Sequence, residues 1–281
     1  MFDTLRGMAA TRPVRRELPE SLALLARRTR PTTLAREDLL PVLGPLEELL
    51  GGPGLQRGAT VVVSGTGVPG ATSLLLALLA GPSTAGAWCA VVGAPDLGLA
   101  AAGELGVALG RLVLVPGPGR RLAQVAGALL EGCDVVCVCT PSVLAPPEAR
   151  RLAARARERR AVLVVATGRA AGSAGSIVSS APCARAGARP VDTSRTGWPG
   201  MPDVRLDVTA SRLSGPGQGD GRVIAHLVEV AATRRRAAPE ELRRWLWLPA
   251  ADGRISLAPD GAAVPPAEPV GEVHRSASGA R

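Results

Sequence analysis

The chain contains no lysine and no tyrosine, and aromatic residues make up only 2% of its 281 residues. One Phe and four Trp cannot build an aromatic core, so the core must come from Val, Leu and Ala, which suits helices packed on a parallel sheet. The same shortage argues against the aromatic platforms on which many modules stack single-stranded nucleic acid. Because all 33 basic residues are Arg, no lysine is present to hold a phosphate.

The sequence also lacks an apolar run long enough to span a membrane, and it begins without the apolar segment of a secretory signal. Its five cysteines lie mostly in apolar runs, where a free thiol behaves as a small hydrophobic group. An odd number of cysteines without a secretory signal fits a reducing compartment. We therefore expect a cytoplasmic protein with no metal site and no membrane contact. The net charge of +9 permits nucleic acid as a partner, through Arg contacts to phosphates.

Apolar strands alternate with Ala- and Leu-rich helical stretches from about residue 41 to 168. Runs such as VVV and VLVV are apolar on both faces, as strands covered by helices on both sides must be. Repeated strand–helix units predict a parallel sheet with right-handed crossovers. The predicted strands are 60–64, 89–92, 112–115, 135–139 and 162–166, and the predicted helices are 70–80, 98–108, 120–131 and 147–160.

The remaining segments break this rhythm. Residues 1–40 are Arg-rich and Pro-punctuated, and we expect an arm with one short helix after Pro19. The main domain is expected to cover 41–250, with a long, flexible loop at 169–203. Strands near 204–210 and 222–230 flank a Gly-rich turn and predict an antiparallel hairpin. The Pro-, Ala- and Gly-rich residues 251–281 are expected to be a disordered tail.

A glycine-rich turn follows the first strand of the main domain and leads into a helix. It reads Gly65, Thr66, Gly67, Val68, Pro69 and Gly70, and Ala71 and Thr72 follow it. Free backbone N–H groups and the helix dipole make such a turn a site for an anion.

Two motifs compete for this turn. The G-x-G-x-x-G pattern of dinucleotide-binding proteins also needs an acidic residue at the end of the second strand, and here that strand ends in Gly93. The P-loop pattern has the right glycine spacing and a hydroxyl at Thr72, but Ala71 stands where the phosphate-binding Lys belongs. The P-loop pattern therefore lacks its Lys, and the dinucleotide-binding pattern lacks its acidic residue.

The surrounding segments resemble RecA-type recombinases in order along the chain. LEELLGGPGLQRGATVVVSG is similar to the approach to a recombinase P-loop, GELGVALGRLVLV to the link between the second and third strands, CDVVCVCTPSVL to the fourth strand, and RRLAARARERRAVLVVATG to the next helix and the fifth strand. The resemblance implies an α/β fold of the RecA-like P-loop NTPase type. This fold has a mainly parallel central sheet flanked by helices, and here a C-terminal antiparallel hairpin would follow.

Matched residue by residue to this family, the catalytic groups are missing. Ala71 replaces the phosphate-binding Lys, and Cys139 replaces the Mg²⁺-associated Asp at the end of the fourth strand. The water-activating Glu falls near Pro95, and the Gln that senses the γ-phosphate matches Gly168. The resemblance thus implies a degenerate nucleotide site at Gly65, Thr66, Gly67, Gly70, Ala71 and Thr72, with no catalytic residue and no resident cofactor. Removing one charge pair costs about 4 kcal/mol at an effective dielectric near 20, which leaves room for weak ATP binding.

The closing block WPGMPDVRLDVTASRL…GRVIAHLVEV…LWLP, with the lysine-free loop, resembles the actinobacterial ImuA family. Those proteins are RecA-like accessory proteins of an inducible mutagenesis cassette. This resemblance implies a non-hydrolysing accessory role in SOS-type translesion synthesis, near the nucleoid. The implied partners are an ImuB-like inactive homologue of Y-family polymerases, an error-prone polymerase III α subunit, and DNA as a further candidate.

Two other functions stay open at this point: an active RecA-like ATPase and a Rossmann-type NAD(P)-binding protein. Candidate contacts to DNA or a protein partner are of two kinds. Arg169, Arg185, Arg189 and Arg195 lie where recombinases keep a DNA-binding loop, and Trp245 and Trp247 alternate with Leu as in an edge strand. A disordered insert explains the four arginines equally well, and core or edge packing explains the two tryptophans equally well.

Overall fold

The computed structural model describes residues 38–65, 68–140, 144–167, 198–215, 223–235, 241–259 and 262–263. The chain divides between Asp38 and Leu39, and all the elements below belong to the second part. Most of the expected arm at 1–40 and most of the expected loop at 169–203 lie outside the described residues. The expected tail at 251–281 includes a short strand at Ser256–Leu257, and its residues from 264 onward lie outside them.

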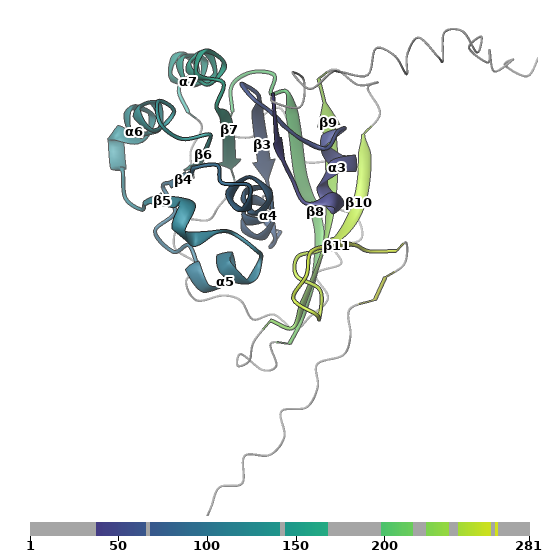
Figure 1. Cartoon of the computed structure of the whole chain (residues 1–281). Coiled ribbons are helices and arrows are strands. Elements are labelled where there is room, and N and C mark those ends of the chain that lie inside the picture. The colour runs from purple at the N-terminus through teal and green to yellow at the C-terminus, as the bar shows by residue number, and fades with distance from the viewer. Residues whose placement is uncertain are drawn as a thin grey trace, which may run out of the picture. The chain divides into compact units, whose positions relative to one another are not determined.

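One mixed sheet organises the described residues, with the strand order β11-β10-β9-β8-β3-β7-β6-β4-β5 (Figure 1). The six strands from β8 to β5 in this order are parallel, and β9, β10 and β11 continue the sheet in antiparallel pairs. The bounds are β3 Thr60–Ser64, β4 Cys89–Val92, β5 Leu112–Val115, β6 Val135–Thr140, β7 Val162–Thr167, β8 Val204–Ser214, β9 Ala225–Arg234, β10 Leu242–Trp247 and β11 Ser256–Leu257.

Helices cover the two faces of the sheet in separate groups. The bounds are α3 Gly44–Leu50, α4 Ala71–Thr84, α5 Leu99–Glu104, α6 Leu122–Leu129 and α7 Pro146–Arg159, with short 3₁₀ helices η1 Leu109–Arg111 and η2 Gly119–Arg121. Helices α3, α4 and α5 share one apolar core with one face of the sheet, and α6 and α7 share a second core with the other face. A separate two-stranded ladder, β1 Leu39–Pro41 with β2 Gly54–Gln56, brackets α3 and joins the first core.

The sequence explains this layering. Every residue of β3, β4, β6 and β7 is buried, as their unbroken apolar runs predict for central parallel strands. Helix α4 is apolar on nearly every side and is buried along almost its whole length. Helix α7 buries only a stripe of Ala149, Leu152, Ala153 and Ala156, and its charged residues face outward.

The predicted α/β class is confirmed: a mainly parallel sheet lies between helices, and β8 and β9 form the antiparallel hairpin. The five predicted strands of the main domain are all present. The helix predicted at 98–108 is too long, because α5 ends after Glu104 and Gly106 takes a φ of 92°. Within the described part of the chain, no helix has the length and apolar character that a membrane crossing needs.

Candidate functional site at the carboxyl edge of the sheet

The glycine-rich turn connects the carboxyl end of β3 to the first turn of α4. Gly70 precedes the helix with a φ of 124°, which favours glycine, and its carbonyl oxygen accepts a hydrogen bond from Leu74 N at 2.8 Å. Gly65 and Gly70 therefore lie where the sequence predicts them, between strand and helix. Thr66 and Gly67 lie outside the described residues.

Apolar side chains of the hairpin pack against this turn. A Cβ atom on Gly70 would lie 3.0 and 3.1 Å from the two methyl groups of Val228, and a Cβ on Gly65 would lie 3.6 Å from Cβ of Val208. His226 also lies beside Gly70, and its Nε2 is 3.3 Å from Ser211 Oγ. Burial lowers the pKa of His226 to about 4, so this ring is neutral at pH 7 and supplies no cation to the turn.

The two positions that the RecA resemblance assigns to a phosphate-binding Lys and a Mg²⁺-associated Asp hold small, uncharged side chains. Ala71 is the first residue of α4 and is 9% exposed, with Thr72 half-buried beside it. Cys139, near the end of β6, is 2% exposed and belongs to the apolar core on the α4 side of the sheet. Among the described residues, no group of three or more His, Cys, Asp or Glu side chains is placed to hold a metal ion.

Strand β4, which pairs with β6, is followed at the carboxyl edge of the sheet by a glycine in close contact with β6. Gly93 follows β4 with a φ of 83°, and a Cβ built on it would lie 2.4 Å from the carbonyl oxygen of Cys139. Its own N–H donates to Val115 O at 2.9 Å. Pro95 and Asp96 lie beyond it on the surface, and Gly168 lies outside the described residues. Position 93 thus requires glycine at the edge where the RecA resemblance predicts acidic side chains.

A row of polar residues crosses the carboxyl edge, and sequence reasoning missed it. Strand register places Thr140, Thr167, Ser64 and Asp207 side by side on β6, β7, β3 and β8. Ser64 Oγ donates a hydrogen bond to Asp207 Oδ1, and the buried Thr167 Oγ1 finds no hydrogen-bond partner among the described atoms. The row offers hydroxyl groups and one carboxylate to the edge where α/β sheets commonly bind ligands.

Asp207 has an unusual electrostatic position in this row. Burial raises the pKa of its carboxyl, and the hydrogen bond from Ser64 and the charge of Arg205 only partly oppose that effect. Because the pKa is raised in the folded state, the contribution of Asp207 to stability is present at low pH. It is lost as the pH rises from the unfolded value of about 3.9 through the folded value.

We expect Asp207→Asn to change the pH dependence of stability. From about pH 4 to pH 7, the free energy of unfolding of the wild-type chain should fall relative to that of the variant, because Asn cannot ionise. Urea denaturation followed by circular dichroism at several pH values measures this difference. Asp96→Asn, at an exposed position, is the control and should run parallel to wild type. A constant difference for Asp207→Asn across the range contradicts the prediction.

The other predicted contact residues are not gathered at this edge. Trp245 and Trp247 lie half-buried on β10, on the face opposite the buried Leu246. The guanidinium of Arg212 lies 5.3 Å from the centre of the Trp245 ring, within the range of a cation–π contact. Arg169, Arg185, Arg189 and Arg195 lie outside the described residues.

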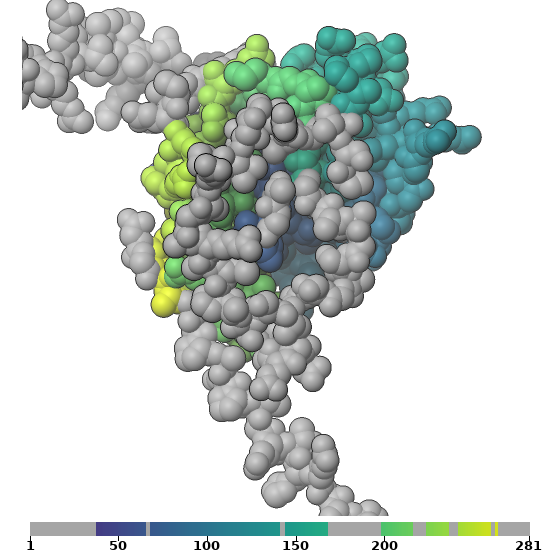
Figure 2. Space-filling view, turned by 180° about the vertical axis from the view of Figure 1, so that it is seen from behind, coloured from purple at the N-terminus to yellow at the C-terminus, as the bar shows by residue number. Residues whose placement is uncertain are grey.

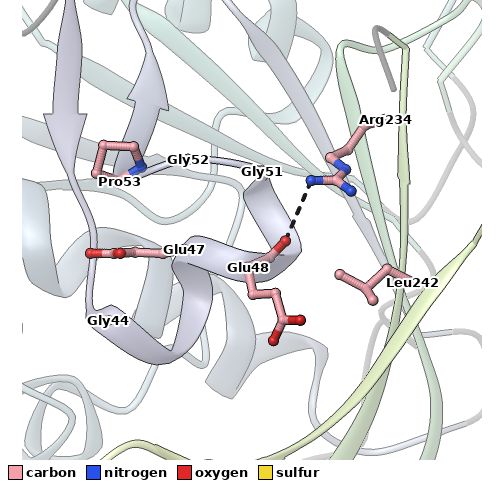
Figure 3. Close-up of a pocket in the computed structure, with 8 residues that line it drawn as sticks. All are labelled: Gly44, Glu47, Glu48, Gly51, Gly52, Pro53, Arg234 and Leu242. Carbon is pink, nitrogen blue, oxygen red and sulfur yellow. Dashed lines mark hydrogen bonds between the residues drawn. The ribbon is translucent and has the colours of Figure 1, made fainter. Parts of the chain in front are cut away.

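A surface hollow of about 570 Å³ lies at the opposite, amino edge of the parallel strands (Figure 3). Arg234 Nη1 reaches across it to the carbonyl oxygen of Glu48 at 3.5 Å, and the Glu48 carboxylate pairs with Arg244. The hydrogen bond ties α3 to β9, and the ion pair ties α3 to β10. The residues that line the hollow are Gly44, Glu47, Glu48, Gly51, Gly52, Pro53, Arg234 and Leu242. The hollow shares no residue with the glycine-rich turn.

Three comparisons with known proteins accompany this geometry. Residues 48–172 match the family model described as the MT3502 N-terminal domain. The chain is 36% identical over 152 residues to the uncharacterized protein Rv3395c of Mycobacterium tuberculosis (strain ATCC 25618 / H37Rv), covering 54% of this chain and 68% of that protein. The crystal structure of the RadB recombinase is similar at 17% identity and a TM-score of 0.46, covering 72% of this chain and 92% of that chain.

Proposed function

The chain belongs to the family of the uncharacterised Mycobacterium tuberculosis protein Rv3395c, and we propose that it is a RecA-like accessory protein that binds partners and does not hydrolyse ATP. Its role is in SOS-type mutagenic repair, by translesion synthesis. The family membership itself names no activity. The proposal comes from the carboxyl edge of the sheet and from the resemblance of the sequence to the ImuA family.

One observation carries the non-hydrolysing part of the proposal. Phosphoryl transfer needs a cation at the β- and γ-phosphates, a carboxylate associated with Mg²⁺ and a positioned water. The first two positions hold Ala71 and Cys139, both in apolar surroundings. The turn itself packs against Val228 and Val208. A glycine-rich turn supported by hydrocarbon in this way stabilises the fold without holding a triphosphate tightly, so any ATP binding is weak.

The partners in the proposal follow from the ImuA resemblance. They are an ImuB-like inactive homologue of Y-family polymerases and an error-prone polymerase III α subunit, with DNA as a further candidate, in the cytoplasm near the nucleoid. Co-purification of the chain with an ImuB-like polymerase homologue tests this part directly. Absence of a complex in a reciprocal pull-down with both purified proteins would reject it.

We expect ATP turnover by the purified chain to equal that of a no-protein blank, with and without single-stranded DNA. The Ala71→Lys variant should remain equally inactive, because Cys139 and Pro95 still supply no oxygen ligand for a metal. Release of inorganic phosphate with Mg²⁺ present measures both. Magnesium-dependent turnover by the wild-type chain would establish an active ATPase instead. Saturable binding of NADH at micromolar concentration, followed by its fluorescence, would favour a dinucleotide-binding protein.

A further inference from the structure

The strand β5 ends the sheet at the side opposite β11, and no described strand pairs with its outer edge. Its sequence is Leu112, Val113, Leu114 and Val115, and all four residues are only half-buried. Figure 1 shows β5 at the outer end of the sheet, between α5 and α6. Proteins commonly protect a free sheet edge with charged side chains, and this strand has none within it.

The backbone of β5 leaves hydrogen-bonding groups on that edge. Val115 O accepts from Gly93 N at 2.9 Å on the β4 side, so the N–H and C=O of Leu114, one residue earlier, point the other way. The N–H of Leu112 is already used, since it donates to Leu109 O in the preceding 3₁₀ helix. Among the described residues, the N–H and C=O of Leu114 have no hydrogen-bond partner, and an added strand needs such groups.

Large apolar side chains are also exposed in the segments that adjoin β5, namely the residue before β4, the start of α5, and η1. Trp88 is 42% exposed and Leu109 and Leu99 are each 46% exposed, which is high for large apolar residues. Leu109 lies 3.6 Å from the position of a Cβ on Gly103, one helical turn from Leu99 on α5. Strand β5 with Trp88, Leu99 and Leu109 is called the β5 edge below.

The charged residues that precede and follow β5 in the sequence are arginines, whereas Asp134 accepts a hydrogen bond from Trp88 N and is paired with Arg57. Arg111 precedes the strand and lies with its guanidinium 5.0 Å from the centre of the Trp88 ring. Arg120 and Arg121 follow it in η2 and are exposed. No Asp or Glu occurs between Leu105 and Leu130. Figure 2 shows this blue-teal part of the surface on the side opposite the yellow-green strands β9 to β11.

This charge pattern decides which partner fits. Antiparallel pairing of β5 with β5 of a second copy would gather the arginines that flank the strand in both chains at one interface, and like charges repel. An apolar strand with acidic residues at its ends meets attraction at both ends of β5. We propose that the β5 edge binds an extended, apolar segment of a partner protein, flanked by acidic residues, by strand addition. This deepens the proposed partner-binding role, on which it rests, and names the surface and the chemistry of the partner.

A labelled peptide tests the proposal with the full chain. The probe is a fluorescein-labelled synthetic peptide with an alternating Val-Thr core and aspartates at both ends, and its control has lysines in place of the aspartates. Fluorescence anisotropy at low salt should show saturable binding of the aspartate peptide only. The triple variant Arg111→Glu, Arg120→Glu and Arg121→Glu should bind the aspartate peptide about tenfold more weakly. Three exposed charge pairs with the peptide are lost, and the new glutamates repel its aspartates. The matched control is Arg150→Glu, Arg151→Glu and Arg157→Glu on exposed positions of α7.

Hydrogen exchange locates the bound peptide. The amide of Leu114 should exchange more slowly when the aspartate peptide is present, and the α7 triple variant should behave as wild type. Absence of saturable binding, an equal loss in both triple variants, or unchanged exchange at Leu114 overturns the proposal. A dimer seen by sedimentation analysis also overturns the proposal if the β5 triple variant weakens that dimer. In that case the β5 edge binds a second copy of the chain. These assays contain no nucleotide, so ATP hydrolysis by the chain would reject the proposed function and leave this result standing.

Discussion

The substitution Gly93→Ala is expected to lower the free energy of unfolding by about 3 kcal/mol. Two costs add at this position. The φ of 83° strains any residue with a Cβ, and that Cβ would lie 2.4 Å from the carbonyl oxygen of Cys139. The clashing atom belongs to the backbone of a buried central strand, so it cannot move aside as a flexible side chain would. Urea denaturation followed by circular dichroism measures the change.

Gly110→Ala is the matched control for this substitution. Gly110 lies in η1, has no positive φ, and has no atom within 4 Å of an added Cβ. We expect its free energy of unfolding to stay within about 0.5 kcal/mol of wild type, as for other surface substitutions. If Gly93→Ala were equally mild, then β4 and β6 would be free to separate at the carboxyl edge. The interpretation that the Cys139 carbonyl group excludes a side chain at position 93 would then be wrong.

The central strands could be predicted from the sequence because their signal is local. Val61–Val63 and Val162–Val165 are unbroken apolar runs, and the structure buries each of these residues completely. The elements that sequence reasoning missed are short. Strands β1 and β2 have three residues each and helix α3 has seven, too few for a periodic pattern to emerge. Their apolar residues, Leu46 and Leu49 among them, are buried only through contacts between elements.

The residues of the candidate site likewise fall into those that a local sequence pattern locates and those that only the folded sheet brings together. The positions of Ala71 and Cys139 at the carboxyl edge could be predicted because each belongs to a contiguous strand or turn with a recognisable pattern, and their role as replacements stays a prediction. Asp207 could not, because its nearness to Ser64 depends on β8 adding beside β3, more than 140 residues away in sequence. The same holds for Val228, which reaches the glycine-rich turn only because the hairpin extends the sheet. Register between distant strands is a property of the folded sheet that a local pattern does not contain.

Cys139→Asp is expected to destabilise the chain by about 4 kcal/mol at pH 7. The substitution restores the carboxylate that the RecA resemblance implies, but it places it where the native side chain is 2% exposed and packed in an apolar core. Burial raises the pKa of a carboxyl, and a shift of about three units corresponds to about 4 kcal/mol between the protonation states. Urea denaturation at several pH values measures the effect.

The sign of the pH dependence separates charge from packing. The unfolded variant ionises near pH 3.9, whereas the folded variant resists ionisation, so its stability should be greatest in acid and should fall as the pH rises through that window. The control Cys139→Ala loses the sulfur without adding a charge, so its deficit of about 1 kcal/mol should not depend on pH.

Magnesium gives the outcome that would contradict this account. Millimolar Mg²⁺ is added to the Cys139→Asp variant alone, or to the double variant Cys139→Asp, Ala71→Lys with ATP present. If Mg²⁺ raised the free energy of unfolding in either case, the introduced carboxylate would be binding the metal at a preserved site. The edge would then be an intact nucleotide site lacking only side chains. We expect no such stabilisation, because Gly93 packs its backbone against Cys139, and Val228 and Val208 support the turn where the phosphates of a nucleotide would lie. Such stabilisation would identify a dormant ATPase, whereas its absence is expected of a sheet edge at which Cys139 lies in an apolar core.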